Sequence, residues 1–351
     1  MALKLKVLGR AVPKDKHLLV VGLQEIGKSV AVTGDGINDT EALRGANVGF
    51  AMGSGCSVAK DASDMILIDD NFESTMKAMM WGRNIYDNVR RFIQFQVTVN
   101  FSVLILEFLG TAILGEPPIS GVQLLWVNLI MDTFAAIALA GEKPQPSIIR
   151  TPPTKGGQLV MTKLVWRQIY GMTLWNCIAI VLLLLFGKLF YGLEYQKNDP
   201  YYEVIDGKTV PTNKCIMYTI VFETFIFLQL FNEFNCRCIE PKKYNMFSNL
   251  LGSWLFVLVV VATFLLTIFF VEFLGTAFRV CSLTSQQHAA CMLWGSTVLL
   301  IAILLKLTPL SWLEYLPVFI DENKGIDPND PLMAAYLEQA NAKAIAKVQD
   351  E

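Results

Sequence analysis

The chain has 351 residues, of which 53% are hydrophobic and 17% are charged. A soluble domain usually carries about a quarter charged residues, so we expect a large part of this chain to lie in lipid. The net charge of −2 gives no basis for a nucleic-acid partner. Seven cysteines without Cys-x-x-Cys spacing and two histidines do not support a zinc site or a disulfide framework. Residues 1–28 lack the pattern of a signal peptide, which predicts a cytosolic N-terminus.

The first part of the chain has the pattern of a soluble α/β segment. Short apolar stretches typical of strands occur at residues 7–9, 30–32, 48–52 and 65–68. Helices are expected between or beside them at residues 14–26, 39–44 and 58–62. This alternation predicts a parallel sheet, whose ligands bind beyond the carboxyl ends of its strands. Asp35 and Asp69 both follow such strand ends.

The most specific motif is TGDGIND at residues 33–39, directly after an apolar stretch. Gly34 and Gly36 allow a tight turn and a close backbone approach. Asp35 and Asp39 place two carboxylates at the mouth of the sheet, where oxygen ligands suit Mg²⁺. Asp-Gly and Asn-Asp pairs are also ordinary turn and helix-cap residues, but the complete run in this context favours a functional site.

Six apolar stretches follow, each close to the roughly 20 residues that a helix needs to cross the hydrocarbon core. They lie at residues 92–114, 122–140, 169–191, 215–231, 254–273 and 291–307. We therefore expect an α/β segment at 1–85, an all-α membrane domain of six helices at 86–308, and a tail at 309–351. Lysine and arginine cluster before the first stretch and in alternate connections, which predicts that these connections and both termini are cytosolic.

Three polar residues stand within the first two membrane stretches: Asn100, Asn128 and Asp132. The spacing of four between Asn128 and Asp132 predicts that both side chains share one helix face. A carboxylate inside the membrane is costly and usually marks an ion path or a charge pair. One carboxylate with amide oxygens forms a plausible partial shell for Ca²⁺. The alternative for the asparagines is hydrogen bonding between helices.

At this point the sequence resembles a known family. The segment TGDGINDTEALRGANVGFAMG (residues 33–53) looks like the hinge motif of P-type ATPases, whose phosphorylation domain has the haloacid-dehalogenase fold. The resemblance implies that Asp35 binds Mg²⁺ and that Asp39 supports this site. It also implies that Asn38 is a catalytic residue and that Gly34 and Gly36 contribute to cofactor binding. PKDK at 13–16 resembles the lysine motif of the family, which implies that Lys16 neutralises a phospho-aspartate.

The similarity continues through MWGRNIYDNVRRFIQFQ (80–96), expected to be a continuous stalk helix, and GVQLLWVNLIMDTFAAIALAGEKP (121–144). It is greatest to the plasma-membrane-type calcium pump, and implies that Asn100, Asn128 and Asp132 occupy ion-site positions. Gln229 and Asn232 fall at or near further ion-site positions. Val103 and Met131 stand where pumps with two calcium sites carry glutamate and threonine, which implies one calcium site. Glu107 is expected nearer the outer mouth.

The resemblance implies ATP and Mg²⁺ as cofactors, Ca²⁺ as the transported ion, and a plasma membrane or an acidic store as the location. The chain has no DKTG motif and no recognisable nucleotide domain, so we expect it to be catalytically incomplete by itself. The alternatives are a pump for another cation, or a non-catalytic membrane fragment that associates with intact pumps. The tail lacks the basic amphipathic pattern of a calmodulin target. An oxidising compartment would allow a Cys281–Cys291 disulfide, with free thiols as the alternative.

Overall fold

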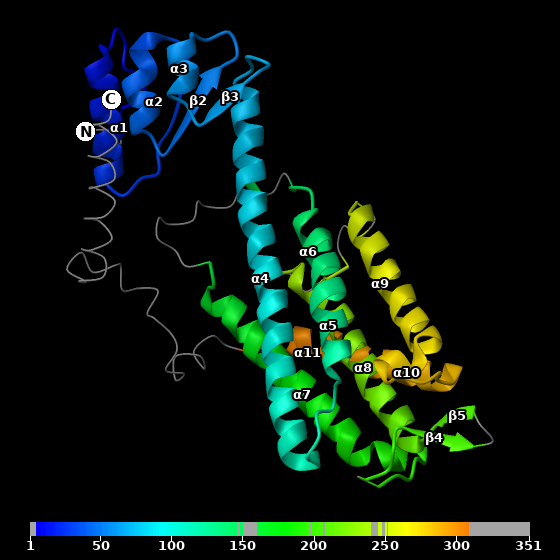
Figure 1. The fold of residues 1–351 in the computed structure, drawn as a ribbon. Coiled ribbons are helices and arrows are strands. Elements are labelled where there is room, and N and C mark those ends of the chain that lie inside the picture. The colour runs from blue at the N-terminus through cyan, green and yellow to red at the C-terminus, as the bar shows by residue number, and fades with distance from the viewer. Residues whose placement is uncertain are drawn as a thin grey trace. The chain divides into compact units, whose positions relative to one another are not determined.

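The computed structural model describes residues 5–145, 148–149, 160–196, 198–205, 208–239, 245–247, 250 and 252–308 (Figure 1). The expected tail at 309–351 lies outside these residues. The chain divides into two compact units. The first, here called the α/β unit, is formed mainly by residues 1–84, and the helical unit contains residues 85–143 and 160–320.

Three parallel strands form the sheet of the α/β unit in the order β1-β2-β3. They are β1 (Ala31–Gly34), β2 (Val48–Met52) and β3 (Met65–Leu67). The helices of this unit are α1 (Pro13–Glu25), the 3₁₀ helix η2 (Ile37–Asp39), α2 (Thr40–Gly45) and α3 (Ser57–Asp61). The α/β pattern and the parallel sheet are confirmed, whereas the likeness to the haloacid-dehalogenase fold stays a prediction.

The start of the α/β unit differs from the sequence expectation. The strand predicted at residues 7–9 is wrong, because residues 5–8 have no regular structure and a turn follows at Gly9 and Arg10. Helix α1 then begins at Pro13, whose fixed φ suits the first helical turn. The amide of Gln24 donates a 2.8 Å hydrogen bond to the carbonyl of Gly45, which fixes the end of α1 against α2.

The described residues contain six helical segments that are long and apolar enough to cross a membrane, as the sequence predicted. They are α4 (Glu73–Leu114), the run α5–η3–α6 (Gly121–Ala140), α7 (Lys163–Tyr191), α8 (Asn213–Cys236), α9 (Trp254–Phe273) and α11 (Ser285–Leu307). Helix α4 is continuous, so the predicted stalk runs without a break into the first span. A hairpin of β4 (Tyr202–Ile205) and β5 (Lys208–Pro211) and the short helix α10 (Gly275–Phe278) lie in connections.

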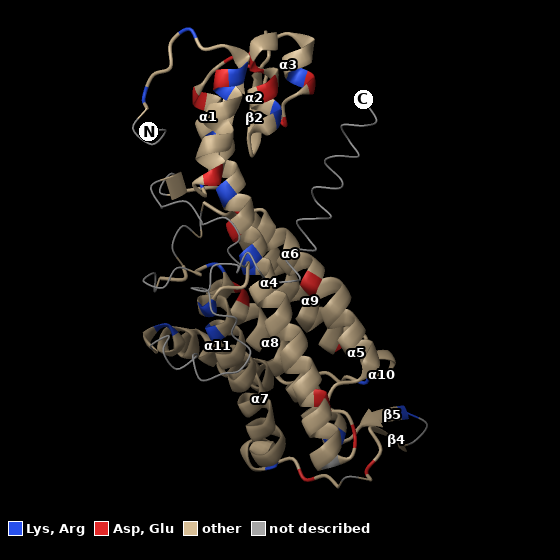
Figure 2. Ribbon diagram, turned by 90° about the vertical axis from the view of Figure 1, so that its left-hand side faces the viewer, with Lys and Arg blue, Asp and Glu red and all other residues tan. Residues whose placement is uncertain are grey.

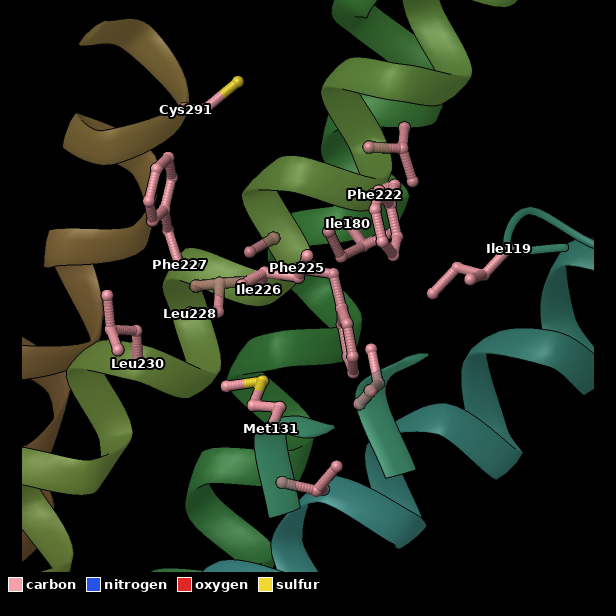
Figure 3. Close-up of a cluster of buried hydrophobic side chains, with 14 of the residues drawn as sticks. Ile119, Met131, Ile180, Phe222, Phe225, Ile226, Phe227, Leu228, Leu230 and Cys291 are labelled. Carbon is pink, nitrogen blue, oxygen red and sulfur yellow. The ribbon is translucent and has the colours of Figure 1, made fainter. Parts of the chain in front are cut away.

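Helix α8 is the most buried of the spans. Its Phe225 and Phe227 are almost fully buried in an apolar cluster that also includes Met131 and Ile180 (Figure 3). On another side, a Cβ added to Gly295 of α11 would lie 2.8 Å from the backbone carbonyl carbon of Phe227. The absence of a side chain at Gly295 therefore lets α11 approach α8 closely, as small residues do between membrane helices.

The outer faces of the bundle are apolar. Lys, Arg, Asp and Glu are sparse along the middle of the long helices (Figure 2). Helix α9 exposes Leu258, Leu265 and Phe269, each by half or more of its surface. Such faces are suited to contact with lipid or with further membrane helices, because no water is needed to solvate them.

Candidate functional site

Lys16 and Asp39 form an ion pair in the α/β unit. The ammonium Nζ of Lys16 lies 2.5 Å from Oδ1 of Asp39. The other carboxylate oxygen of Asp39 accepts a 3.4 Å hydrogen bond from the backbone N–H of Gly36. A Cβ at Gly34 would lie 2.5 Å from Cβ of Asp39, so the close approach of these residues requires glycine there. The lysine motif and the hinge motif therefore meet, although they are separated by 23 positions in sequence.

Asp35 and Asn38 belong to the same motif but have exposed side chains. Asp35 follows β1, and its backbone carbonyl accepts a 2.9 Å hydrogen bond from the N–H of Cys56. Its position is thus fixed by the backbone while its carboxylate remains accessible. This arrangement suits Asp35 as an oxygen ligand for Mg²⁺. Asp39 is engaged by Lys16 and suits a supporting role.

Asp69 follows β3 at the same edge of the sheet. Its Oδ2 accepts a 2.5 Å hydrogen bond from the hydroxyl of Ser74, and this bond lowers the pKa of Asp69 below its usual value. No group of three or more His, Cys, Asp or Glu side chains in the described residues is arranged to hold a metal ion. A magnesium ion at Asp35 would therefore need further oxygen ligands from a substrate, from water or from other parts of the protein.

A polar contact in the helical unit joins Gln96 of α4 to Asp132 of α6. Nε2 of Gln96 donates a 2.7 Å hydrogen bond to Oδ2 of Asp132. Asp132 is 6% exposed, and its second oxygen has no hydrogen-bond partner among the described residues. One oxygen is thus fixed while the other retains its full capacity to accept a ligand.

The helix that carries Asn128 and Asp132 is not a regular α-helix. A π-helical turn, η3 (Val127–Met131), separates α5 (Gly121–Trp126) from α6 (Asp132–Ala140). The backbone N–H of Asp132 bonds to the carbonyl of Val127, five residues back. Asn128 is exposed and Asp132 is buried among the described residues, and the expectation that the two side chains share one helix face stays a prediction.

Asn100 is also exposed, and lies four residues after Gln96 on α4. Side chains at this spacing occupy one face of a helix, so Gln96 and Asn100 share the face of α4 on which Asp132 is held. The structure therefore brings Gln96 and Asp132 into contact, and leaves Asn100 and Asn128 open to partners outside the described residues.

Helix α8 contributes a group of fully buried polar side chains. Among the described residues, neither amide atom of Gln229 has a hydrogen-bond partner, and neither carboxylate oxygen of Glu233 has one. Asn232 accepts a 3.3 Å hydrogen bond from Asn235, but its own amide nitrogen has no partner. Buried polar groups are normally hydrogen-bonded, so this group is suited to a water molecule, a proton or an ion.

Two residues of this region were missed from the sequence, Gln96 and Glu233. Glu233 lay outside the predicted fourth span at 215–231, whereas α8 continues to Cys236. Gln96 carries no charge, and its signal was its spacing of four before Asn100. Of the other predicted positions, Met131 is buried and Val103 is half-buried. Oε1 of Glu107 accepts a hydrogen bond from the N–H of Ile119, after the connection that leads out of α4.

Cys281 and Cys291 are free thiols with separate partners. Sγ of Cys281 lies 3.5 Å from the hydroxyl of Thr219, and Sγ of Cys291 lies 3.8 Å from the carbonyl of Ile220. The structure thus agrees with the free-thiol alternative for Cys281 and Cys291.

Comparison with known proteins identifies the class. The family model described as cation transporting ATPase, C-terminus, matches residues 116–308. The chain belongs to the family of P-type cation-transporting ATPases.

The relatives narrow this class. Plasma membrane calcium-transporting ATPase 4 of Homo sapiens is 43% identical over 319 residues, which cover 89% of this chain and 25% of the relative. Probable calcium-transporting ATPase 6, plasma membrane-type, of Oryza sativa subsp. japonica is 38% identical over 88% of this chain and 29% of the relative. Calcium-transporting ATPase 4, plasma membrane-type, of Arabidopsis thaliana is 40% identical over 87% of this chain and 28% of the relative. The chain thus spans between 25% and 29% of these curated relatives.

Proposed function

We propose that this chain supplies the transmembrane calcium site and the magnesium-binding hinge motif of an ATP-driven calcium pump. The pumping activity belongs to the complete protein that contains this sequence, here called the parent pump. The phosphorylated aspartate, the nucleotide-binding part and the remaining membrane helices are assigned to regions outside these 351 residues.

The observation that carries the proposal is the environment of Asp132. Its carboxylate is buried within an apolar helix and retains one oxygen without a partner among the described residues. An ionised carboxylate in that setting is unfavourable unless a cation joins it. The amide of Gln96 orients the carboxylate, and the buried Gln229 and Asn232 of α8 are proposed to offer amide oxygens as further ligands. Calcium accepts carboxylate and amide oxygens in this kind of mixed shell.

Asn100 and Asn128 complete the proposed calcium shell together with residues from helices outside this chain. Their exposure supports this assignment, because a polar side chain on an exposed face of an apolar helix needs a partner within the membrane. Val103 and Met131 offer no oxygen from their side chains, which favours a single calcium ion over two. We propose calcium rather than another cation because the relatives are calcium-transporting ATPases.

The α/β unit is proposed to serve the phosphorylation step. Asp35 would hold Mg²⁺, Asp39 would keep Lys16 in place, and the Lys16 ammonium would offset negative charge on the phospho-aspartate. The 2.5 Å contact between Lys16 and Asp39 supports the joint role, because it brings the two motifs together. Magnesium would supply charge neutralisation of the phosphoryl oxygens. A likeness to the haloacid-dehalogenase fold is part of this proposal.

The distribution of basic residues supports a proposal for the orientation of the chain in the membrane. Both ends of the chain are proposed to lie in the cytosol, because the basic clusters flank the same ends of the spans. The membrane is proposed to be the plasma membrane or the membrane of an acidic store. Lipids and Ca²⁺ are the expected partners. No calmodulin-binding pattern stands out in the sequence.

The test is the uptake of radiolabelled calcium into vesicles that carry the parent pump. We expect ATP-dependent uptake, and we expect Asp132→Asn to abolish it while the protein still reaches the membrane. Glu203→Gln is the matched control, since Glu203 is an exposed carboxylate in the β4–β5 hairpin and should transport normally. Absence of calcium uptake by the parent pump, or normal uptake by Asp132→Asn, would overturn the proposal.

A further inference from the structure

Three ionisable side chains from three helices meet at a second place in the helical unit. Nδ1 of His288 lies 2.6 Å from Oε1 of Glu223, and Nε2 of the same ring lies 3.0 Å from Oε1 of Glu272. Glu223 belongs to α8, Glu272 to the last turn of α9, and His288 to the first turns of α11. We call these residues the Glu-His-Glu triad. It is separate from Asp132, and the proposed calcium site does not use it.

Counting protons shows what this geometry requires. A neutral imidazole carries one N–H, so it can donate to one carboxylate but not to two. With two ionised carboxylates, its bare nitrogen would face an acceptor oxygen at hydrogen-bond distance. Both contacts can be hydrogen bonds when the triad gains one proton, either on the ring or on one carboxyl group. In both arrangements the triad has a net charge of −1 instead of −2.

The surroundings favour retention of this proton. The side chain of Glu223 is 0% exposed, and its second oxygen has no hydrogen-bond partner in the described part of the chain. Among the described residues, no Lys or Arg forms an ion pair with either carboxylate. A net charge of −2 in a largely apolar setting is more unfavourable than −1.

Other titratable groups face the triad and do not supply a positive charge. Tyr191 of α7 and Cys291 of α11 lie near Glu223, and Cys281 lies near Glu272. Each of these groups is neutral or negative when it titrates. The backbone N–H of Leu283 donates a 3.1 Å hydrogen bond to Oε1 of Glu272 and fixes that carboxylate.

The geometry fits a proton better than a metal ion. The carboxylates contact different nitrogens of the same ring, so the three groups do not converge on one common point. A metal ion needs its donor atoms arranged around such a point at about 2 Å. The described residues also contain no group of three metal-binding side chains suitably arranged.

We propose that Glu223, Glu272 and His288 form a proton-binding site that links α11 to α8 and α9, and that loss of the proton at higher pH weakens this link. His288 and Glu272 are 17% and 31% exposed, so the site has a route for proton exchange that Glu223 alone lacks. Because α8 also carries Gln229 and Asn232, the triad restrains a helix that contributes to the proposed calcium site. This consequence rests on the proposed function.

The sign of the pH dependence follows from the proton count. The folded arrangement binds a proton that the separated groups lose more readily as pH rises. Its contribution to stability is therefore present at lower pH and is lost at higher pH. We expect the thermal unfolding midpoint of the purified parent pump to fall by a few degrees as pH rises from acid to alkaline.

Glu223→Gln is the decisive variant. An amide at this position donates to Nδ1 without an added proton, and the neutral ring then donates through Nε2 to Glu272. The variant should show a high unfolding midpoint that lacks the pH-dependent step. His288→Gln should lower the midpoint, because it removes the ring that bridges the carboxylates. His17→Gln, which changes the other histidine of this chain, should follow the unmodified pH profile.

The unfolding measurement does not depend on calcium transport, so it separates this inference from the proposed function. If Glu223→Gln retains the same pH-dependent step as the unmodified protein, or if the unmodified protein has no step, the proton-binding site is wrong. If the step is lost in Glu223→Gln and retained in His17→Gln, the site is supported whether or not the parent pump transports calcium.

Discussion

Gln96 holds Asp132 through a 2.7 Å hydrogen bond that joins α4 to α6. This contact gives a buried carboxylate a defined orientation without neutralising its charge. An amide suits that task better than a lysine or an arginine, because a fixed positive charge would compete with a transported cation for the same oxygens. We therefore propose that Gln96 positions Asp132 in the proposed calcium site.

The first prediction concerns Gln96. Gln96→Ala should raise the calcium concentration that half-activates the ATPase of the parent pump by about tenfold. The physical reason is that Asp132 loses its donor, and a lost hydrogen bond to a buried charged group costs roughly 1–3 kcal/mol. Calcium-dependent ATP hydrolysis measures the change. An unchanged calcium dependence would show that Gln96 does not orient Asp132 during transport.

The second prediction concerns Glu233. Its fully buried carboxyl group has no hydrogen-bond partner among the described residues, so it is expected to be neutral when the site is empty. Glu233→Gln should therefore leave the unfolding midpoint nearly unchanged in a calcium chelator. Glu233→Lys should lower it strongly, because a full positive charge would be buried in place of a neutral group. Equal losses in the two variants would mean that Glu233 is ionised in the empty state.

The sequence could predict the membrane spans because their existence depends on summed hydropathy. It could not fix all their ends: α8 continues past the predicted residue 231 to Cys236, and this brought Glu233 into the core. It also missed the π turn at Val127–Met131, since a shift of backbone hydrogen bonds by one residue leaves no hydropathy signal. The contact between Lys16 and Asp39 could be predicted only from the motif resemblance, because no local sequence pattern pairs residues so far apart.

The third prediction concerns the buried acceptor Glu142, just after α6. Its Oε1 forms an ion pair with Nε of Arg237 at 2.5 Å, and its Oε2 forms an ion pair with Arg91. The side chains of Arg237 and Glu142 are only 5% and 10% exposed. Glu142→Leu should destabilise the parent pump by about 3–5 kcal/mol, because both arginines lose their shared counter-charge.

Thermal unfolding in detergent measures this loss, with Glu73→Gln as the matched control. Glu73 pairs with Lys77 in an exposed i,i+4 contact, at a distance of 3.5 Å. Removal of such a surface pair should change stability by less than about 1 kcal/mol. If the two variants unfold at the same temperature, the ion pairs of Glu142 with Arg91 and Arg237 do not stabilise the packing of α4, α6 and α8.

The last prediction tests the close approach within the hinge motif. In Gly34→Ala, the new Cβ would lie 2.5 Å from Cβ of Asp39, a distance that carbon atoms do not tolerate. Asp39 must move, and its ion pair with Lys16 is then lost or lengthened. The parent pump should consequently form far less phosphoenzyme from ATP. Gly36→Ala is the comparison, since its added Cβ would come no closer than 3.8 Å to Asp39 and needs no displacement. Gly36→Ala should retain considerably more phosphoenzyme than Gly34→Ala. If both variants lose phosphorylation to the same extent, backbone flexibility of the motif controls the reaction, and the position of Asp39 beside Lys16 does not.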